Sequence, residues 1–200
     1  MPSHLLASRV LPRVRRVRRL SQVCTYDGTP AERTFIACKP DSLQRALLGE
    51  VFGRFERRGF QLCALKLLVP SRSLVEAHYE EHRGKAFFER ACVFMASGPV
   101  VASVWEGRGA VSACRAMIGV TEPLESAPGT IRGDFGVHWR RNLVHGSDSV
   151  DSAEREINLW FEPHELVAWT RPSAPWLYEL PSSPITWAEL DEQHSIGLPP

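Results

Sequence analysis

The chain has 200 residues, 44% apolar and 24% charged, enough to bury about two-thirds of its unfolded surface in one domain. Residues 1–26 hold six arginines and no acidic residue, so the formal net charge of +1 conceals a body with 18 basic and 23 acidic side chains. This acidic body argues against nucleic acid as a partner, because phosphate backbones are bound through excess Lys and Arg.

The first 28 residues have the composition of a mitochondrial presequence, rich in Arg and Ser. Apolar side chains recur there at helical spacing, at Leu6, Val10, Val14 and Val17. Such a basic amphipathic helix is suited to import, although Pro12 weakens it. We predict a presequence over 1–28 and a mitochondrial location, in the intermembrane space or the matrix. The alternative is a disordered basic tail on a cytoplasmic protein, able to bind an anionic lipid surface.

The globular pattern begins with the run "TFIACK" (34–39), whose β-forming residues predict a first strand. After it, Asp41 and Ser42 can cap a helix, and apolar residues recur every four positions up to Phe55. This spacing predicts one continuous helix over 43–59. The run "FQLCALKLL" then predicts a second strand.

In the middle of the chain, the sequence predicts helices over 71–82 and 84–96, a strand over 99–107 and a further helix over 110–118. Ser, Gly and Pro mark the ends of these elements. The next stretch, "GVTEPLESAPGTIRGDFG" (119–136), is rich in Gly and Pro and longer than an ordinary connection. It is predicted to be irregular, and either functional or disordered.

The last elements are a short extended piece, "NLVH" (142–145), and a helix over 149–161. The whole order matches the split βαβ plan, so we predict an α/β fold, specifically an α+β sandwich. It is expected to be ferredoxin-like, βαββαβ, with a four-stranded antiparallel sheet and extra helices. The domain should cover 30–180, followed by a Pro- and Ser-rich tail over 181–200.

The cysteines and the apolar runs indicate the cellular environment in which the protein folds. The five cysteines are an odd number without a C-x-x-C pair, which argues against a disulfide framework or a structural zinc site. The apolar runs are far shorter than the roughly 20 residues of a membrane-spanning helix. We therefore predict a reducing compartment and no membrane span.

His145 is the first candidate for chemistry. It ends the extended piece and precedes Gly-Ser-Asp-Ser, where an imidazole can act as a nucleophile or a base. Taken alone, however, a histidine in this position is more often a packing residue. Metal binding is weaker still, because no second His or Cys lies within ligand spacing of it in the sequence.

The motif around His145 makes a catalytic role a better interpretation than a packing role. "NLVHGSDS" resembles the N-x-x-H-G-S-D-S signature of nucleoside diphosphate kinases, and the resemblance continues through "ERTFIACKPDSLQR", "RFERRGF", "MASGPVVASVWEG", "PGTIRGDF" and "WLYE". It covers about residues 32–179 and is most similar to group I animal enzymes, while the Arg-rich start resembles their mitochondrial member. The resemblance implies transfer of the γ-phosphoryl of a nucleoside triphosphate, chiefly ATP, to a nucleoside diphosphate. The route would be ping-pong through phosphorylated His145.

The resemblance also implies a nucleotide site. The residues that match the family's phosphate-contacting positions are Lys39, Arg115, Thr121 and Arg132. Asn142 matches the residue that binds the ribose hydroxyls, and Phe87 matches the aromatic on which the base stacks.

Three further matches lie close to the imidazole in the family. Tyr79 matches a tyrosine near the phosphohistidine, and Ser147 and Glu156 match residues that steady the ring. The glutamate would accept the second N–H of His145 and so fix its tautomer. Mg²⁺ is the implied cofactor, held mainly by nucleotide phosphates rather than by protein ligands. The implied assembly is a homohexamer.

Three positions depart from the family's pattern. Ser42 stands where the family usually has Gly, and would be strained if that position needed a positive φ. Ala91 replaces a larger aliphatic that helps to cover the base, and Trp139 replaces a small residue near it. A function of another class also stays open, namely an oligomer that bridges membranes or partners through its basic segments, with kinase activity secondary.

Overall fold

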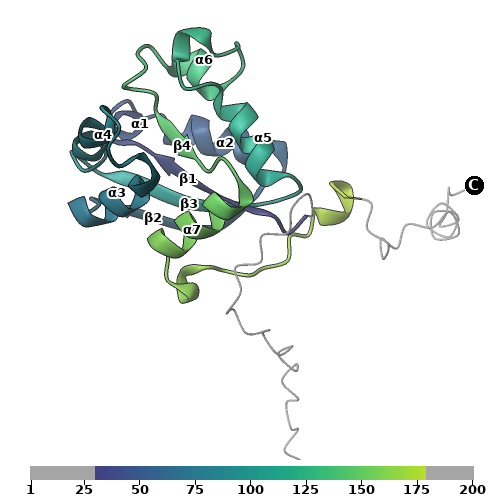
Figure 1. The fold of residues 1–200 in the computed structure, drawn as a ribbon. Helices are drawn as coiled ribbons and strands as arrows, with labels where there is room; N and C mark the ends of the chain where they lie inside the picture. Colours follow the sequence, from purple (N-terminus) through teal and green to yellow (C-terminus); the bar gives the residue numbers. More distant parts are fainter. Residues whose placement is uncertain (1–29, 179–200) are drawn as a thin grey trace, which may run out of the picture.

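Four antiparallel strands form the single sheet of the computed structural model, which describes residues 30–178 (Figure 1). The strands are β1 (Arg33–Cys38), β2 (Gln61–Leu68), β3 (Val100–Glu106) and β4 (Val144–Gly146). Their order across the sheet is β2-β3-β1-β4, and every pair is antiparallel. The predicted α+β, ferredoxin-like fold is therefore confirmed.

Seven α-helices and four short 3-10 turns connect the strands within the described residues. The helices are α1 (Pro40–Gln44), α2 (Leu48–Arg58), α3 (Arg72–His78), α4 (Phe88–Met95), α5 (Ala110–Ile118), α6 (Ile131–Phe135) and α7 (Val150–Trp160). The 3-10 turns are η1 (Glu80–His82), η2 (Pro123–Glu125), η3 (Pro163–Glu165) and η4 (Ala174–Trp176). None of these helices is long and apolar enough to cross a bilayer.

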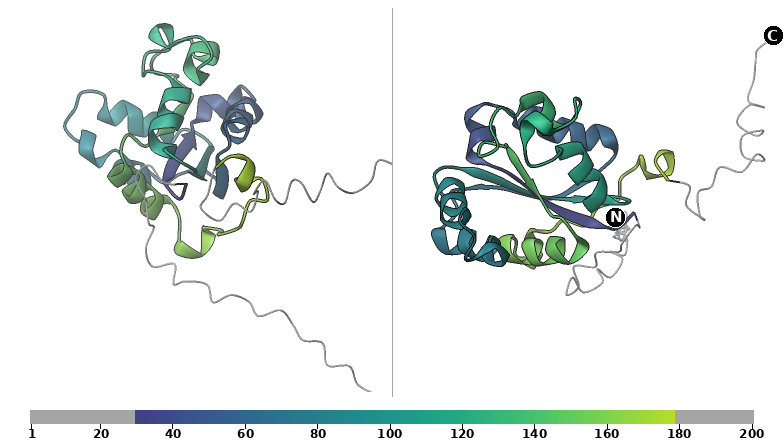
Figure 2. Two further views of the ribbon diagram at one scale, coloured as in Figure 1. Left: turned by 90° about the vertical axis from the view of Figure 1, so that its right-hand side faces the viewer. Right: turned by 45° about the horizontal axis from the view of Figure 1, so that its top comes forward.

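The sheet has a core on each face, because successive side chains of a strand point to opposite sides. Phe35 of β1 belongs to the cluster covered by α3, α4 and α7, whereas Ile36 belongs to the cluster under α2, α5 and α6. Figure 2 shows the two helical layers on either side of the sheet. Strand β1, buried on both faces, thus brings its end at Cys38 beside β4, which carries His145.

The prediction of one helix over 43–59 is wrong. Two helices occupy this region, α1 and α2, and between them Ala46 adopts a left-handed backbone with φ of 55°. Ala46 breaks the helix although the apolar spacing continues across it, and the Leu47 amide bonds back to the Ser42 carbonyl. Pro40 is the first residue of α1, where its missing N–H costs nothing.

The helices predicted over 71–82 and 84–96 are shorter than expected. Ser71 caps α3 by accepting the Leu74 amide, as predicted, but α3 ends at His78 and η1 follows. Helix α4 begins only at Phe88, because Gly84 has a left-handed φ of 85° and the residues after it form turns. Helix α5 has the predicted bounds.

The Gly- and Pro-rich stretch over 119–136 is ordered. It contains η2 and the short helix α6, which Thr130 caps by accepting the Gly133 amide. The stretch after α7 lies along the molecule, where Arg171 donates to the Gly59 carbonyl. The predicted presequence over 1–28 and the tail over 181–200 lie outside the described residues.

Candidate active site

His145 lies in β4, a three-residue strand paired with the end of β1, where it stands opposite Ala37. Its neighbours Val144 and Gly146 are buried, while the His145 side chain keeps 22% of its surface exposed. The backbone is therefore fixed by the sheet, and the imidazole stays accessible to a small ligand.

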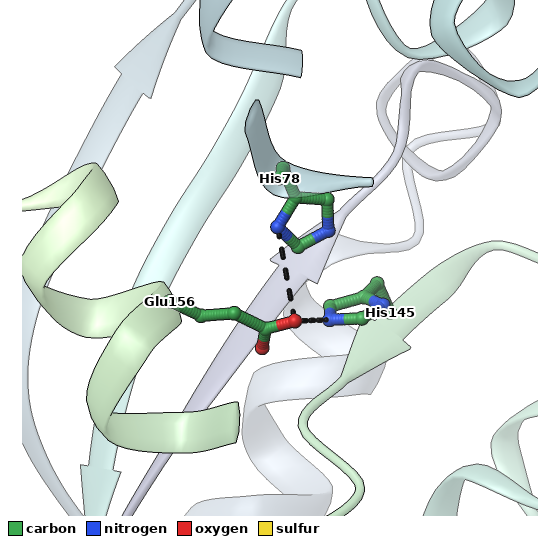
Figure 3. Close-up of side chains that lie close together, drawn as sticks. All are labelled: His78, His145 and Glu156. Atoms are coloured by element: carbon green, nitrogen blue, oxygen red, sulfur yellow. Dashed lines mark hydrogen bonds and ion pairs between the residues drawn. The ribbon is translucent and has the colours of Figure 1, made fainter. Parts of the chain in front are cut away.

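Glu156 holds the imidazole from the facing helix α7 (Figure 3). His145 Nε2 lies 2.9 Å from Glu156 Oε1, and the Ser147 hydroxyl donates to the other carboxylate oxygen at 2.6 Å. A carboxylate accepts hydrogen bonds only, so this contact places the imidazole proton on Nε2. Nδ1, on the far side of the ring, then carries the lone pair. His145, Ser147 and Glu156 are brought together as predicted.

His78 is the residue of this site that sequence reasoning missed. Its ring is buried and packs edge-to-face on His145, with 4.4 Å between ring centroids. Burial, and then the nearby His145, lowers the pKa of His78 well below its ordinary value, so the ring is neutral. The sequence did contain a signal for it, because His78 follows apolar residues of the predicted helix and directly precedes Tyr79. A histidine on such an apolar face has to bury its polar ring, which then needs a polar neighbour.

Asn142 joins several of the predicted nucleotide residues. The Lys39 ammonium donates to Asn142 Oδ1 at 2.7 Å, and the Asn142 amide group donates to the Thr121 carbonyl at 3.1 Å. Arg132 donates to the Asn142 carbonyl at 3.1 Å. Asn142 thus connects three other residues of the predicted nucleotide site, and its bond to Lys39 joins positions 103 residues apart.

Arg132 is first of all a structural residue. Besides the bond to Asn142, its guanidinium donates to the carbonyls of Gly119 and Val144 at 3.0 and 2.7 Å. A guanidinium has five N–H groups, so these bonds leave part of its donor set for another acceptor. Arg115 is more exposed and donates to the Gly146 carbonyl at 3.2 Å, next to His145.

A row of aromatic rings runs outward from the buried His78. The Tyr79 ring packs on His78 at 4.7 Å, His82 stacks with Tyr79 at 6.3 Å, and Phe87 meets His82 edge-on at 5.3 Å. Burial raises the pKa of the Tyr79 hydroxyl. Phe87, 42% exposed just before α4, therefore presents an open ring, and within the described residues that ring contacts His82 rather than His145.

The part of the chain that builds this site is similar to known proteins. A model of the family described as nucleoside diphosphate kinase matches residues 32–166. A nucleoside diphosphate kinase of Schizosaccharomyces pombe is 57% identical over 148 residues, covering 74% of this chain and 98% of that protein. One from Saccharomyces cerevisiae is also 57% identical, over 76% of this chain and 99% of that protein.

The chain belongs to the nucleoside diphosphate kinase family.

Solved structures agree with the assignment. A family protein from Babesia bovis is 48% identical, with a TM-score of 0.72 over 74% of this chain and 99% of that one. A nucleoside diphosphate kinase from Halobacterium salinarum in complex with CDP is 44% identical, with a TM-score of 0.73 and the same coverage. The predicted phosphotransferase activity is confirmed at the level of the family, and the bridging alternative is not favoured.

Ser42 is not strained, contrary to the expectation raised by its departure from the family's glycine. It lies within α1, and positive φ values among non-glycine residues with described structure fall on Ala46 and Leu143. The buried Ser42 hydroxyl donates to the Leu143 carbonyl at 2.5 Å, and Asp41 accepts the Leu143 amide at 3.0 Å. Leu143, with φ of 68°, is thereby held in a left-handed conformation two residues before His145.

Replacing Ser42 with Ala is therefore expected to lower the free energy of unfolding by about 1 kcal/mol. The loss stays small because the Leu143 carbonyl keeps the Lys39 amide at 2.8 Å. Urea unfolding would measure it, with the exposed Ser112 changed to Ala as the control. Equal stability of S42A and wild type would show that the hydroxyl does not hold Leu143.

Lys39 predicts a pH dependence of nucleotide binding. Burial, and then the charge of Arg132, lowers the pKa of Lys39 to about 8. Below that pH the ammonium is charged and can pair with phosphate, and above it the charge is lost. ADP affinity is expected to be flat from pH 7 to 8, then to fall by up to about tenfold per pH unit.

Calorimetric titration with ADP between pH 7 and 9.5 would measure this effect. K39Q should bind ADP more weakly at every pH, without the added decline above pH 8. The same decline in both proteins would assign the titration to another group.

Proposed function

We propose that this kinase moves the γ-phosphoryl group of a nucleoside triphosphate, chiefly ATP, to a nucleoside diphosphate through phosphorylated His145. The observation that carries the proposal is the contact of His145 Nε2 with the buried Glu156 carboxylate at 2.9 Å. It keeps the proton on Nε2 and leaves the Nδ1 lone pair as the nucleophile (Figure 3).

In the first step, Nδ1 attacks the γ-phosphorus. The P–N bond forms while the bond from phosphorus to the β,γ-bridging oxygen breaks, and the nucleoside diphosphate leaves with that electron pair. The ring, now substituted at Nδ1 and protonated at Nε2, carries a positive charge that Glu156 offsets. In the second step a terminal oxygen of another diphosphate attacks the phosphorus, the P–N bond breaks, and neutral imidazole returns.

The cationic side chains around Asn142 support the proposed phosphate site. Lys39 and Arg132 both bond to Asn142, while Arg115 bonds beside His145, so three positive groups lie around the nucleophile. We assign phosphate contacts to these groups and to Thr121, the ribose to Asn142 and the base to the exposed Phe87. Tyr79 and Ser147 complete the surroundings of His145.

Mg²⁺ fits this site as a companion of the nucleotide. The groups that bond to Asn142 are an ammonium, a guanidinium and a backbone carbonyl, whereas Mg²⁺ prefers carboxylates and water. We assign no protein ligand to it. When bound, it would supply charge neutralisation between the phosphates, and this chain's own residues would orient the nucleotide.

The proposal predicts a phosphorylated enzyme that can be isolated. Mixing the full chain with ATP and Mg²⁺ should give an acid-labile, base-stable phosphate, and adding GDP should discharge it as GTP. Failure to form this intermediate, in protein that still converts nucleotides, would replace the ping-pong route with direct transfer.

An oligomer, and specifically the homohexamer of group I enzymes, is part of the proposal. The edge strand β2 supports assembly, because its side chains Leu65 and Leu67 are 52% and 66% exposed. Sedimentation equilibrium of the full chain would give the mass, and a monomer at micromolar concentration would exclude the hexamer.

We further propose that residues 1–28 direct the kinase to mitochondria, with residues 30–180 as its domain and 181–200 as its tail. The Arg-rich, acid-free composition of the first 26 residues supports targeting. Imaging of the full chain fused to a fluorescent protein, with and without residues 1–28, would test it. An anionic-lipid surface is a further proposed partner of the same basic segment.

A further inference from the structure

His78, His145 and Glu156 form a compact group of metal-ligating side chains (Figure 3). One ligand atom from each lies within 4.8 Å of the others. Glu156 Oε1 is central, 2.9 Å from His145 Nε2 and 3.8 Å from His78 Nδ1. In the kinase reaction proposed above, His78 has no chemical task.

The hydrogen bonds of His78 are mismatched. Trp160 donates its indole N–H to His78 Nδ1 at 3.2 Å, so that nitrogen carries a lone pair, which also faces the Glu156 carboxylate. Two acceptors thus face each other at 3.8 Å with no proton between them. His78 Nε2 is buried without a hydrogen-bond partner within the described part of the chain. A cation between His78 Nδ1 and Glu156 Oε1 would give these two facing acceptors a common partner.

We propose that His78, His145 and Glu156 bind one divalent cation of the zinc class, and that this cation blocks phosphorylation of His145. Two imidazoles and one carboxylate are a common zinc set that leaves a fourth position for water. Zinc bonds of about 2.1 Å in a tetrahedron place ligand atoms about 3.4 Å apart. The separations of 2.9 and 3.8 Å, with the third pair within 4.8 Å, reach that spacing by side-chain shifts of about 1 Å.

The ligand set selects against Mg²⁺, because imidazole nitrogen suits Zn²⁺ and Co²⁺ whereas Mg²⁺ prefers oxygen. The surrounding charges limit the affinity. Arg155 lies 3.8 Å from Glu156 Oε1, and the charges of Lys39 and His82 also help to lower the pKa of His78. Of the three side chains, that of His145 is the one open to solvent, at 22% exposure against 0% for His78 and 3% for Glu156.

Bound zinc would replace the proton of His145 Nε2 and draw electron density from the ring. The Nδ1 lone pair becomes a weaker nucleophile, and Glu156 no longer offsets the charge of a phosphorylated ring. This consequence rests on the proposed role of His145, whereas binding itself does not. Zinc should therefore lower phosphoenzyme formation over the same concentration range in which it binds.

The test is zinc titration of nucleotide-free, chelator-treated full chain in excess Mg²⁺, using competition with a chromophoric zinc indicator. We expect one site per chain that Mg²⁺ does not displace, and visible Co²⁺ absorption of a four- or five-coordinate ion. H78Q should bind about 10²-fold more weakly, and H164Q, which changes an exposed histidine, should bind like wild type.

A second variant acts in the opposite direction. W160F removes the N–H that competes for His78 Nδ1 and keeps all three ligands, so zinc should bind about fivefold more tightly. E156Q gives a further ligand loss in case H78Q does not fold. Equal zinc affinity in wild type, H78Q and E156Q would overturn the site. Zinc binding without loss of phosphoenzyme would overturn the block.

Discussion

Replacing His145 with Asn is expected to abolish the phosphoenzyme and to lower nucleotide transfer by about 10⁴-fold or more. Asparagine is close in size and polar, so the buried neighbours Val144 and Gly146 can keep their places. The amide nitrogen has no lone pair that can attack phosphorus, and the covalent route is then closed. Labelled ATP would measure phosphoenzyme formation, and a coupled assay would measure transfer.

The control for this variant is H164N, which changes an exposed histidine in η3 and should keep wild-type rates. ADP binding by calorimetry should also survive in H145N, because the assigned phosphate contacts lie on Lys39, Arg115 and Arg132. An H145N protein that binds ADP and still transfers phosphoryl groups at more than a hundredth of the wild-type rate would remove His145 from the mechanism.

Pattern alone predicted the order of strands and helices along the chain because the signals were local. Turn-forming residues separate the strands from the helices, and α5 has the predicted bounds, with Gly109 and Gly119 at its two ends. The break at Ala46 could not be predicted in this way. The spacing of apolar residues indicates which side chains face the core. This spacing stays the same when one left-handed residue separates two helices that pack on the same face of the sheet.

The sequence predicted which residues belong to the site, but it did not predict the hydrogen bonds between them. Resemblance placed Lys39 and Asn142 in one site, but their bond joins positions 103 residues apart, which no local pattern encodes. Arg132 was predicted to bind phosphate, and the structure shows that three of its donors hold backbone carbonyls. His78 was missed because a buried histidine on a helix resembles any other core position.

Replacing Glu156 with Gln is expected to slow phosphorylation of His145 by about 10²-fold, more than any other change that leaves the nucleophile in place. Glutamine has the same shape, and its amide oxygen can still accept the His145 N–H. What is lost is the negative charge, which lies 2.9 Å from Nε2 and offsets the positive ring of the phosphorylated state. Rapid-quench measurement of phosphoenzyme formation would give the rate directly.

The matched control is S147A, which removes the neutral donor to Glu156 Oε2 at 2.6 Å and keeps the charge. Its rate should fall only about fivefold, as expected for one hydrogen bond. If charge is the cause, E156Q should also shift the equilibrium between ATP plus free enzyme and ADP plus phosphoenzyme toward ATP, while S147A should hardly change it. Equal shifts in both variants would assign Glu156 the task of orienting the ring rather than stabilising its charge.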